Sequence, residues 1–418
     1  MIEQGQAGGT IELSQPASPA RPAAVAFIFL TILLDMLALG LIVPILPKLV
    51  ESFVDNDTAR AARIFGLFGT AWALMQFVFS PILGGLSDRF GRRPVVLLSN
   101  FGLGLDYLLM ALAPSLVWLF VGRVISGITS ASMSTAFAYI ADMTPPERRA
   151  AVFGKVGAAF GAGFVLGPAI GGLLGGLDPR LPFWAAAGLS LANALYGLLI
   201  LPESLPHDRR TPFRWKNANP LGALQLLRSD RMLAGLSVVN FIAQLAHVVL
   251  PSTFVLYATY RYGCDSTTVG LTLATVGICA MAVQGAGVGP IVARFGERGA
   301  LMLGLACGAA GFLIFGAASN GLLFWLGIPV MSLWGVSGAA LQALNTQLVG
   351  PEQQGQLQGA TNSVQSVSQL LGPFLFTLTF AYFIGASAPV KLPGAPFLLA
   401  FVLLLLALVI AARTLARK

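Results

Sequence analysis

The sequence has few charged residues, few histidines and few cysteines. Only 10% of its 418 residues are Asp, Glu, Lys or Arg, whereas 56% are hydrophobic. A soluble domain carries about 25% charged residues and needs that polar surface. The composition therefore excludes a soluble enzyme, a disordered chain and a nucleic-acid-binding protein. His207 and His247 are too far apart for a zinc site, and the three cysteines show no CxxC spacing.

Nucleotide-binding motifs are also missing. The sequence contains no GxxxxGK[ST] motif, and no loop is long enough to hold a nucleotide-binding domain. We therefore expect no metal, no cofactor, no nucleotide and no enzymatic activity.

Long apolar runs dominate instead, and a membrane helix needs about 20 mostly apolar residues. The runs predict an all-α polytopic membrane protein with twelve transmembrane helices in two parallel six-helix bundles. The polar start lacks a signal-peptide pattern, so we interpret residues 1–22 as a disordered cytoplasmic tail. The first bundle covers 23–201, a cytoplasmic linker 202–230, the second bundle 231–412 and a cytoplasmic tail 413–418. The predicted spans are 23–47, 64–85, 94–113, 115–140, 151–176, 181–201, 231–256, 266–292, 299–317, 320–347, 356–384 and 393–412.

The distribution of basic residues predicts the orientation. Lys and Arg together number 25. With the first residue placed inside, 18 of them fall on the inner side and six on the outer side, and Arg123 lies within a span. Because basic residues concentrate in cytoplasmic loops, this split predicts that both termini are cytoplasmic. It also accounts for the net charge of +8 without a nucleic-acid partner.

The two halves of the sequence repeat with an offset of 205 residues. The segment 84–93 lies between spans 2 and 3, and 289–298 lies between spans 8 and 9. The same offset relates Gly154 to Gly359 and Gly167-Pro168 to Gly372-Pro373. Since each half has six spans, the repeat is parallel, as in transporters that bind substrate near the midplane and expose it to each side in turn.

Several motifs resemble those of the major facilitator superfamily. Residues 84–93 resemble its loop motif, and 163–172 matches the GxxxGPxxGG motif of its drug exporters. Residues 33–44 and 105–109 are similar to tetracycline/proton antiporters in particular. The resemblance covers nearly the whole chain and implies a transporter fold and drug export.

The C-terminal half departs from the tetracycline exporters at two places. Those proteins carry an acidic residue in the ninth helix and a histidine in the eighth. Here the ninth span reads GLACGA over 304–309 and has no acid, and the eighth span has no histidine around Cys279.

Three charged residues lie deep inside predicted spans, namely Asp35, Asp106 and Arg123. Intramembrane charges are rare, so each is a functional candidate. Counting about 1.5 Å per residue from the span ends places all three near the midplane. Because the charge of a buried carboxylate depends on burial and on nearby charges, we predict proton coupling by these residues. The alternative is a static ion pair that joins spans 1, 3 and 4.

Polar, uncharged side chains are concentrated in spans 7 and 11. Adding 205 to Asp35 gives Asn240, so a neutral amide replaces the charge in the second half. We predict that the first half handles protons and that the second binds the substrate, although amides can also join helices. The predicted substrate-binding residues are Asn240, Gln244, His247, Gln365 and Gln369. We place His247 nearer the outer end of its span.

The loop motif and the glycine motif have other predicted roles. The resemblance implies that the loop motif holds the outward-open state through charge contacts with a neighbouring helix end. Glycines with a proline in span 5 favour close packing and bending of helices. The predicted conformational gate is Gly84, Asp88, Arg89, Gly91, Arg92 and Arg93, and the predicted packing residues are Gly163, Gly167, Pro168 and Gly171.

Together these observations predict a proton-coupled exporter of an amphiphilic drug such as tetracycline, a monomer in the bacterial inner membrane. Its partners would be a small-molecule substrate, protons and the lipid bilayer. The alternatives are a transporter of a cellular metabolite, lipid precursor or sugar, a proton-independent uniporter, and a membrane receptor that transports nothing.

Overall fold

The computed structural model describes residues 22–130, 133–144, 146–212, 226–227, 230–350 and 353–416, and within these ranges the chain is helical without any strand. This confirms the predicted all-α class. The first half contains α1 (Pro22–Ile42), α2 (Leu46–Ser52), α3 (Thr58–Phe90), α4 (Arg92–Leu112), α5 (Leu116–Ser130), α6 (Met133–Met143), α7 (Pro146–Leu177) and α8 (Leu181–Ile200). The second half contains α9 (Arg231–His247), α10 (Val249–Tyr262), α11 (Ser266–Ala282), α12 (Val288–Ala317), α13 (Gly321–Ser332), α14 (Gly335–Gln347), α15 (Gln354–Ile384) and α16 (Ala395–Leu415).

Eleven helical segments of the described chain are long and apolar enough to cross a membrane, and one of them is two spans. That segment, Ser266–Ala317, has 52 residues and would be about 78 Å long as one helix, more than twice the thickness of a bilayer core. Gly296 interrupts it with φ 67° and ψ 172°. The chain therefore turns at Gly296, and the prediction of twelve spans holds.

The turn at Gly296 repeats a turn in the first half. Gly91 lies 205 residues earlier, separates α3 from α4, and also has a positive φ of 108°. Side chains other than glycine rarely adopt this region. The first helix of each half also ends at equivalent positions, because α1 ends at Ile42 and α9 ends 205 residues later at His247. The sequence repeat is thus a repeat of structure.

The first predicted span is broken near its far end. Helix α1 ends at Ile42, two residues before Pro44, and the chain resumes as α2 at Leu46. Proline has no amide hydrogen to donate and disfavours helix at the residue before it. The span thus runs to Ser52 rather than to residue 47.

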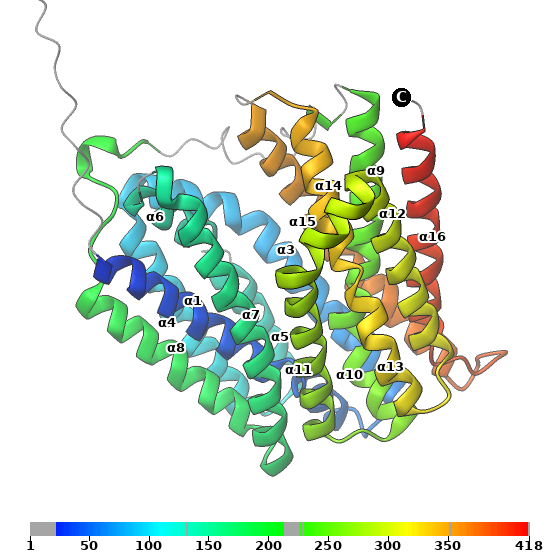
Figure 1. Cartoon of the computed structure of the whole chain (residues 1–418). Helices are drawn as coiled ribbons and strands as arrows, with labels where there is room; N and C mark the ends of the chain where they lie inside the picture. The colour runs from blue at the N-terminus through cyan, green and yellow to red at the C-terminus, as the bar shows by residue number, and fades with distance from the viewer. Residues whose placement is uncertain are drawn as a thin grey trace, which may run out of the picture.

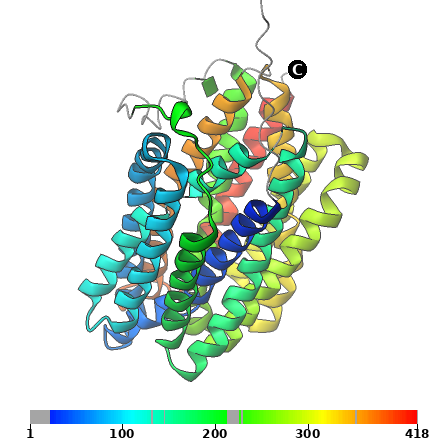
Figure 2. The same cartoon turned by 90° about the vertical axis from the view of Figure 1, so that its left-hand side faces the viewer.

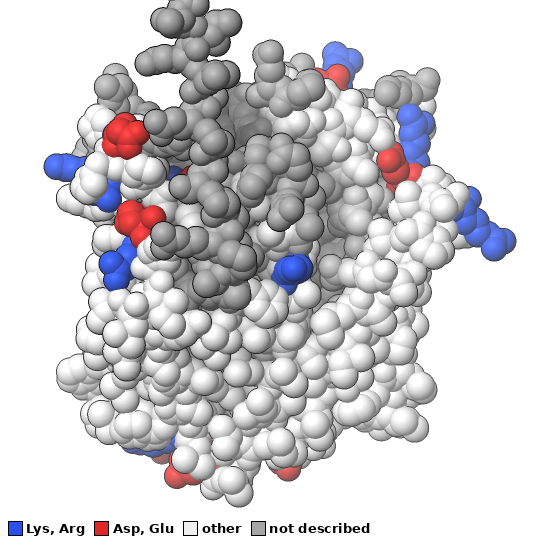
Figure 3. Space-filling model, turned by 60° about the vertical axis from the view of Figure 1, so that its left-hand side comes forward, with Lys and Arg blue, Asp and Glu red and all other residues white. Residues whose placement is uncertain are grey.

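The surface shows a belt with few charges. In Figure 3, Lys, Arg, Asp and Glu gather toward the two ends of the molecule and leave a broad band between them. Large apolar side chains are exposed on the outer helices, for example Leu98 on α4, Leu199 on α8 and Val402 on α16. Such a belt fits the hydrocarbon layer of a bilayer.

The two halves meet along two pairs of helices, α3 with α15 and α7 with α11 (Figures 1 and 2). Glycines allow the close approach: a methyl group on Gly172 of α7 would lie 2.9 Å from the Cα of Gly270 on α11. Similarly, a methyl group on Gly69 of α3 would lie 2.8 Å from Pro373 on α15.

A hydrogen bond joins the halves at the end away from the C-terminus, the lower end in Figure 1. There Lys48 Nζ of α2 donates to the carbonyl oxygen of Cys264 in the second half at 3.1 Å. Toward the opposite end, a methyl group on Gly84, Gly154 or Gly289 would meet nothing within 4 Å. Within the described chain, these three glycines therefore make no contact between the halves.

Candidate functional site

Asp35 lies on α1, where the helix packs against α7 and α8. Its carboxylate is half-buried, and its Oδ1 accepts a hydrogen bond of 3.0 Å from Nδ2 of Asn193 on α8. The same amide lies 3.3 Å from the carbonyl oxygen of Thr31. Asn193 has no exposed surface. The partner of this intramembrane charge is thus a neutral amide.

Asp106 and Arg123 face each other from α4 and α5. Asp106 is 0% exposed and Arg123 is 7% exposed, and Arg123 Nη2 lies 4.0 Å from Asp106 Oδ2. This distance makes an ion pair without a hydrogen bond. Arg123 Nη2 donates instead to Ser126 Oγ at 3.1 Å. The glycine at 122 leaves room for the carboxylate, because a methyl group there would lie 2.8 Å from Asp106 Oδ1.

The structure thus divides the three predicted proton-coupling residues into a pair and a separate carboxylate. Tyr107, which is 1% exposed, interacts electrostatically with Asp35, Asp106 and Arg123. Tyr107 is therefore close enough to both groups to sense their charges. Neither Tyr107 nor Asn193 was a candidate from the sequence, because an uncharged polar residue in a span is not unusual by itself.

Three of the predicted substrate-binding side chains have no hydrogen-bond partner within the part of the chain that the structure describes, namely those of Gln244, Gln365 and Gln369. Gln365 is exposed and the other two are half-buried. Asn240 is 8% exposed. Helices α9 and α15, which carry all four amides, are in contact through a hydrogen bond from Ser368 Oγ to the carbonyl oxygen of Phe241 at 3.2 Å.

His247 lies at a different depth from the one expected. The helical segment that contains it runs from Arg231 to Tyr262, so His247 is near its middle rather than its outer end. The span is longer than predicted because α10 continues it past residue 256. The exposed imidazole lies 5.4 Å from the ring of Trp334, measured between centroids.

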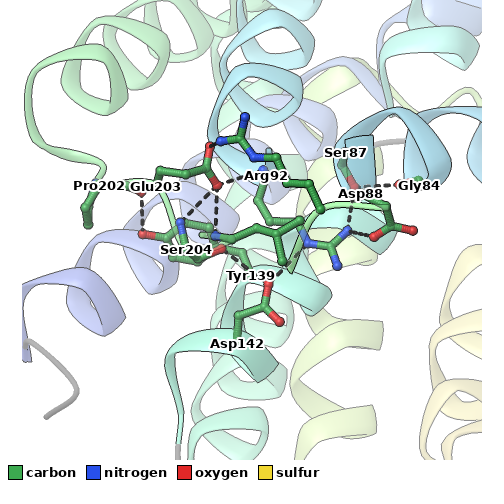
Figure 4. Close-up of polar contacts among 11 residues, drawn as sticks. Gly84, Ser87, Asp88, Arg92, Tyr139, Asp142, Pro202, Glu203 and Ser204 are labelled. Carbon is green, nitrogen blue, oxygen red and sulfur yellow. Dashed lines mark hydrogen bonds and ion pairs between the residues drawn. The ribbon is translucent and has the colours of Figure 1, made fainter. Parts of the chain in front are cut away.

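The loop motif forms a polar network at the end of the molecule where the C-terminus lies (Figures 1 and 4). Arg92 is its centre. Its guanidinium contacts Asp88 at 2.5 Å and Asp142 at 3.2 Å, and it donates to Ser87 Oγ at 2.6 Å. The backbone amide of Arg92 donates to Glu203 Oε1 at 2.8 Å.

Glu203 and Asp142 were not predicted as members of this network. Glu203 also accepts hydrogen bonds from the amides of Ser204 and Leu205 at 3.0 and 3.1 Å, and Asp142 lies in the last turn of α6. Both are acidic residues close to the end of a span, on the same side of the membrane as Arg92. That position in the sequence could have identified them as partners of Arg92. All of these partners lie in the first half or at the start of the linker, and none lies in the second half.

The other predicted gate residues have smaller roles in this conformation. Arg93 Nη2 donates to the carbonyl oxygen of Leu198 at 2.7 Å, and the Arg89 guanidinium lies 5.0 Å from the ring centre of Phe90. Gly91 has a positive φ that favours glycine, and a larger residue would also displace a side chain. A methyl group at Gly91 would lie 2.2 Å from Glu203 Oε2. Nothing in the structure requires a glycine at 84.

The predicted packing residues lie along α7 against α1. Methyl groups on Gly163 and Gly167 would lie 2.6 Å from Met36 Cβ and from Gly40 Cα, and one on Gly171 would lie 2.1 Å from the carbonyl oxygen of Leu41. Pro168 lies within α7, and its carbonyl oxygen would be 2.3 Å from a methyl group on Gly270 of α11. Helix α7 therefore holds α1, which carries Asp35, on one face and the second half on another.

Comparisons with known proteins agree with this architecture. The sequence profile described as Major Facilitator Superfamily matches residues 28–373 and, in a second match, residues 237–418. The tetracycline resistance protein, class C, from Escherichia coli is 39% identical over 86% of this chain and 90% of its own. The class G tetracycline resistance protein from Vibrio anguillarum is 38% identical over 84% of this chain and 89% of its own.

A solved structure has the same fold over nearly the whole length. The crystal structure of the human organic anion transporter MFSD10 (TETRAN) covers 95% of this chain and all of its own length, with a TM-score of 0.69 and 25% identity.

Proposed function

Because this chain belongs to the Major Facilitator Superfamily, we propose that it exports an amphiphilic drug such as a tetracycline in exchange for protons. The observation that carries the proposal is Asp35, a carboxylate within a membrane span whose partner is the neutral Asn193. Carboxylates inside membrane spans mark proton pathways, and the similarity to tetracycline resistance proteins supports a drug as the substrate.

In the proposed cycle, Asp35 is deprotonated while the substrate site is open to the cytoplasm, and drug binds. After the halves rock to open the other side, a proton binds to Asp35 and drug leaves. A proton that enters down a potential of 100 mV contributes about 2.3 kcal/mol, enough for roughly a 40-fold gradient of drug. We assign the structure to the state that loads drug, because the hydrogen bond of Lys48 joins the halves at the opposite end.

Substrate binding is assigned to the unpaired amides of α9 and α15. Asn240, Gln244, Gln365 and Gln369 offer donors and acceptors without charge, and His247 beside Trp334 adds an aromatic surface. Helix α12 has no acid over residues 304–309, where the resemblance would place one. Recognition in the second half therefore relies on hydrogen bonds and apolar contact, which suits amphiphilic molecules of several shapes.

We place the transporter in the bacterial inner membrane as a monomer, with both termini in the cytoplasm. The Arg92 network then lies at the cytoplasmic mouth, where we assign it the role of a conformational gate. Because its partners lie in the first half and at the start of the linker, it would stiffen the ends of α3, α6 and α8 as one body during rocking.

The test is proton flux in liposomes that contain the purified protein and an imposed pH gradient. Tetracycline and a panel of cationic dyes are added to wild type, Asp35→Asn and Asp55→Asn. Asp55 is an exposed residue with φ 55°, a conformation that asparagine tolerates, so it is the matched control.

We expect drug-triggered flux in wild type and the control but not in Asp35→Asn. Flux that survives in Asp35→Asn would remove Asp35 from the mechanism. No flux with any drug from folded protein would favour the alternative of a transporter for a metabolite or another organic solute.

A further inference from the structure

A cluster of buried polar groups surrounds Asp35 between α1 and α8. Thr31 lies one turn before Asp35 on α1, and Ser190 lies one turn before Asn193 on α8. Thr31, Ser190 and Asn193 are each at most 1% exposed. Three oxygen atoms of this cluster have no hydrogen-bond partner, namely Thr31 Oγ1, Ser190 Oγ and Asn193 Oδ1. Buried polar groups of proteins are nearly always bonded, so this cluster needs an explanation.

The second half has the same helix pair without the cluster. Helix α9 packs on α16 as α1 packs on α8. The offset of 205 relates Thr31 to Leu236 and Asp35 to Asn240. Pro182-Phe183 at the start of α8 corresponds to Pro396-Phe397 at the start of α16, so Ser190 corresponds to Leu404 and Asn193 to Ala407.

Leu236, Leu404 and Ala407 are all 0% exposed. The fold therefore packs this helix pair with apolar side chains where no proton has to be handled. Helix packing alone does not account for Thr31, Ser190 and Asn193 in the first half, and Asp35 is the feature that distinguishes the two pairs.

We propose that Asn193 is a positioning residue whose hydrogen bond to Asp35 changes direction with the protonation state of Asp35. This inference rests on the proposed proton exchange. When Asp35 is ionised, the Asn193 amide donates N–H to its Oδ1, as the distance of 3.0 Å shows. When a proton from the medium binds to the carboxylate, the new O–H donates to Asn193 Oδ1, which now has no partner. The amide thus changes from donor to acceptor, and no covalent bond forms or breaks apart from the O–H bond of the carboxyl.

This change also alters how α1 is tied to α8. In the ionised state the same amide group is 3.3 Å from the carbonyl oxygen of Thr31. An amide that turns its oxygen toward Asp35 withdraws its N–H groups from both α1 acceptors. Proton binding therefore loosens α1 on α8.

Few other charges act on Asp35. Helix α8 has no charged residue, and the charged residues of α7 end at Lys155, two turns before Gly163, which contacts Met36. On α6, Asp142 is held by Arg92. From α4, Tyr107 interacts electrostatically with Asp35, and the charge of Asp106 is paired with that of Arg123.

The test is infrared spectroscopy of the whole protein in liposomes during a pH titration. The protonated carboxyl of Asp35 is assigned as the C=O band that is lost in Asp35→Asn. The band is then followed in wild type, Asn193→Leu and Asn345→Leu. Asn345 on α14 is the matched control, a 3% exposed amide whose Oδ1 also has no partner.

We expect Asn193→Leu to raise the midpoint of the band by about one pH unit, because the hydrogen bond lost by the ionised carboxylate is stronger than the one lost by the protonated carboxyl. Its C=O frequency should also rise, because the carboxyl loses its acceptor. Asn345→Leu should change neither. A midpoint and frequency unchanged in Asn193→Leu would refute the role of Asn193 and leave the proposed exporter intact.

A missing Asp35 band at every pH would instead overturn the proton switch itself. If Asn193→Leu does not fold, Asn193→Ala removes the same bonds without added volume. It is expected to shift the band in the same directions, and an unshifted band would refute the inference equally.

Discussion

Removing either partner of the Asp106–Arg123 pair should destabilise the protein far more than removing both. At 4.0 Å, two unit charges attract by about 4 kcal/mol with an effective dielectric constant near 20. Both side chains are under 10% exposed, and both carboxylate oxygens of Asp106 lack a hydrogen bond. A single neutralisation, Asp106→Asn or Arg123→Gln, leaves one buried charge without its counterion, which costs about 3–5 kcal/mol.

The assay is a double-mutant cycle on reversible unfolding in mixed detergent micelles. The double variant Asp106→Asn/Arg123→Gln has no buried charge at this place, so we expect it to recover at least half of the loss of each single variant. The coupling energy should be about 2–4 kcal/mol. The two amides of the double variant are buried and need hydrogen-bond partners, so the stability of the double variant should not recover completely.

Additive losses would refute this reasoning. They would mean that the two charges do not interact across 4.0 Å, and that each is compensated by other groups. The same proteins separate structure from transport. A stable double variant without drug-triggered proton flux would assign the pair a role in transport, whereas one with normal flux would show that it is only structural.

Three further predictions concern other parts of the molecule. Gly171→Ala should unfold at a lower temperature than wild type, because its methyl group would lie 2.1 Å from a backbone oxygen of α1. Gly188→Ala is the control and should not unfold earlier, because a methyl group at Gly188 would meet no atom within 4 Å. Lys48→Met should speed the labelling of Cys264 by an impermeant maleimide at a pH high enough to ionise the thiol, since it removes the hydrogen bond between the halves. Burial raises the pKa of the Cys264 thiol and the Lys48 charge lowers it, so at neutral pH the variant has less thiolate and the comparison is made at high pH. Asp142→Asn should slow transport several-fold, because it weakens the Arg92 network. The rate is measured as initial drug uptake into inverted vesicles, and unchanged uptake would exclude a gating role for the network.

The fold was largely predictable because the bilayer imposes simple rules. Backbone groups inside a membrane must be satisfied within a helix, so long apolar runs translate directly into spans. The turn at Gly296 shows the limit of counting helices, since the chain reverses there with almost no loop. The repeat identified it in advance, because Gly91 occupies the same place in the first half.

The site was predictable where it depends on charge and less so where it depends on neutral groups. Asp35, Asp106 and Arg123 are conspicuous because charge in a membrane span is costly. Asn193 is not, since an amide in a helix bundle often joins helices. Its contact with Asp35 depends on the relative rotation of α1 and α8, which the apolar pattern does not fix. The depth of His247 was misjudged for a similar reason, because α10 extends the span.

The repeat also shows where the two halves differ chemically. The three intramembrane charges of the first half correspond, 205 residues later, to Asn240, Gly311 and Ile328. Gly311 packs against the backbone of Met331, and Ile328 is 0% exposed, so the second half uses for close packing the positions at which the first half holds an ion pair. A rocking motion needs two rigid bodies but only one of them has to sense protons. In the proposed exporter the second half is therefore free to vary its polar, uncharged surface with the substrate, while changes at α1, α4, α5 and α8 would alter the coupling to protons.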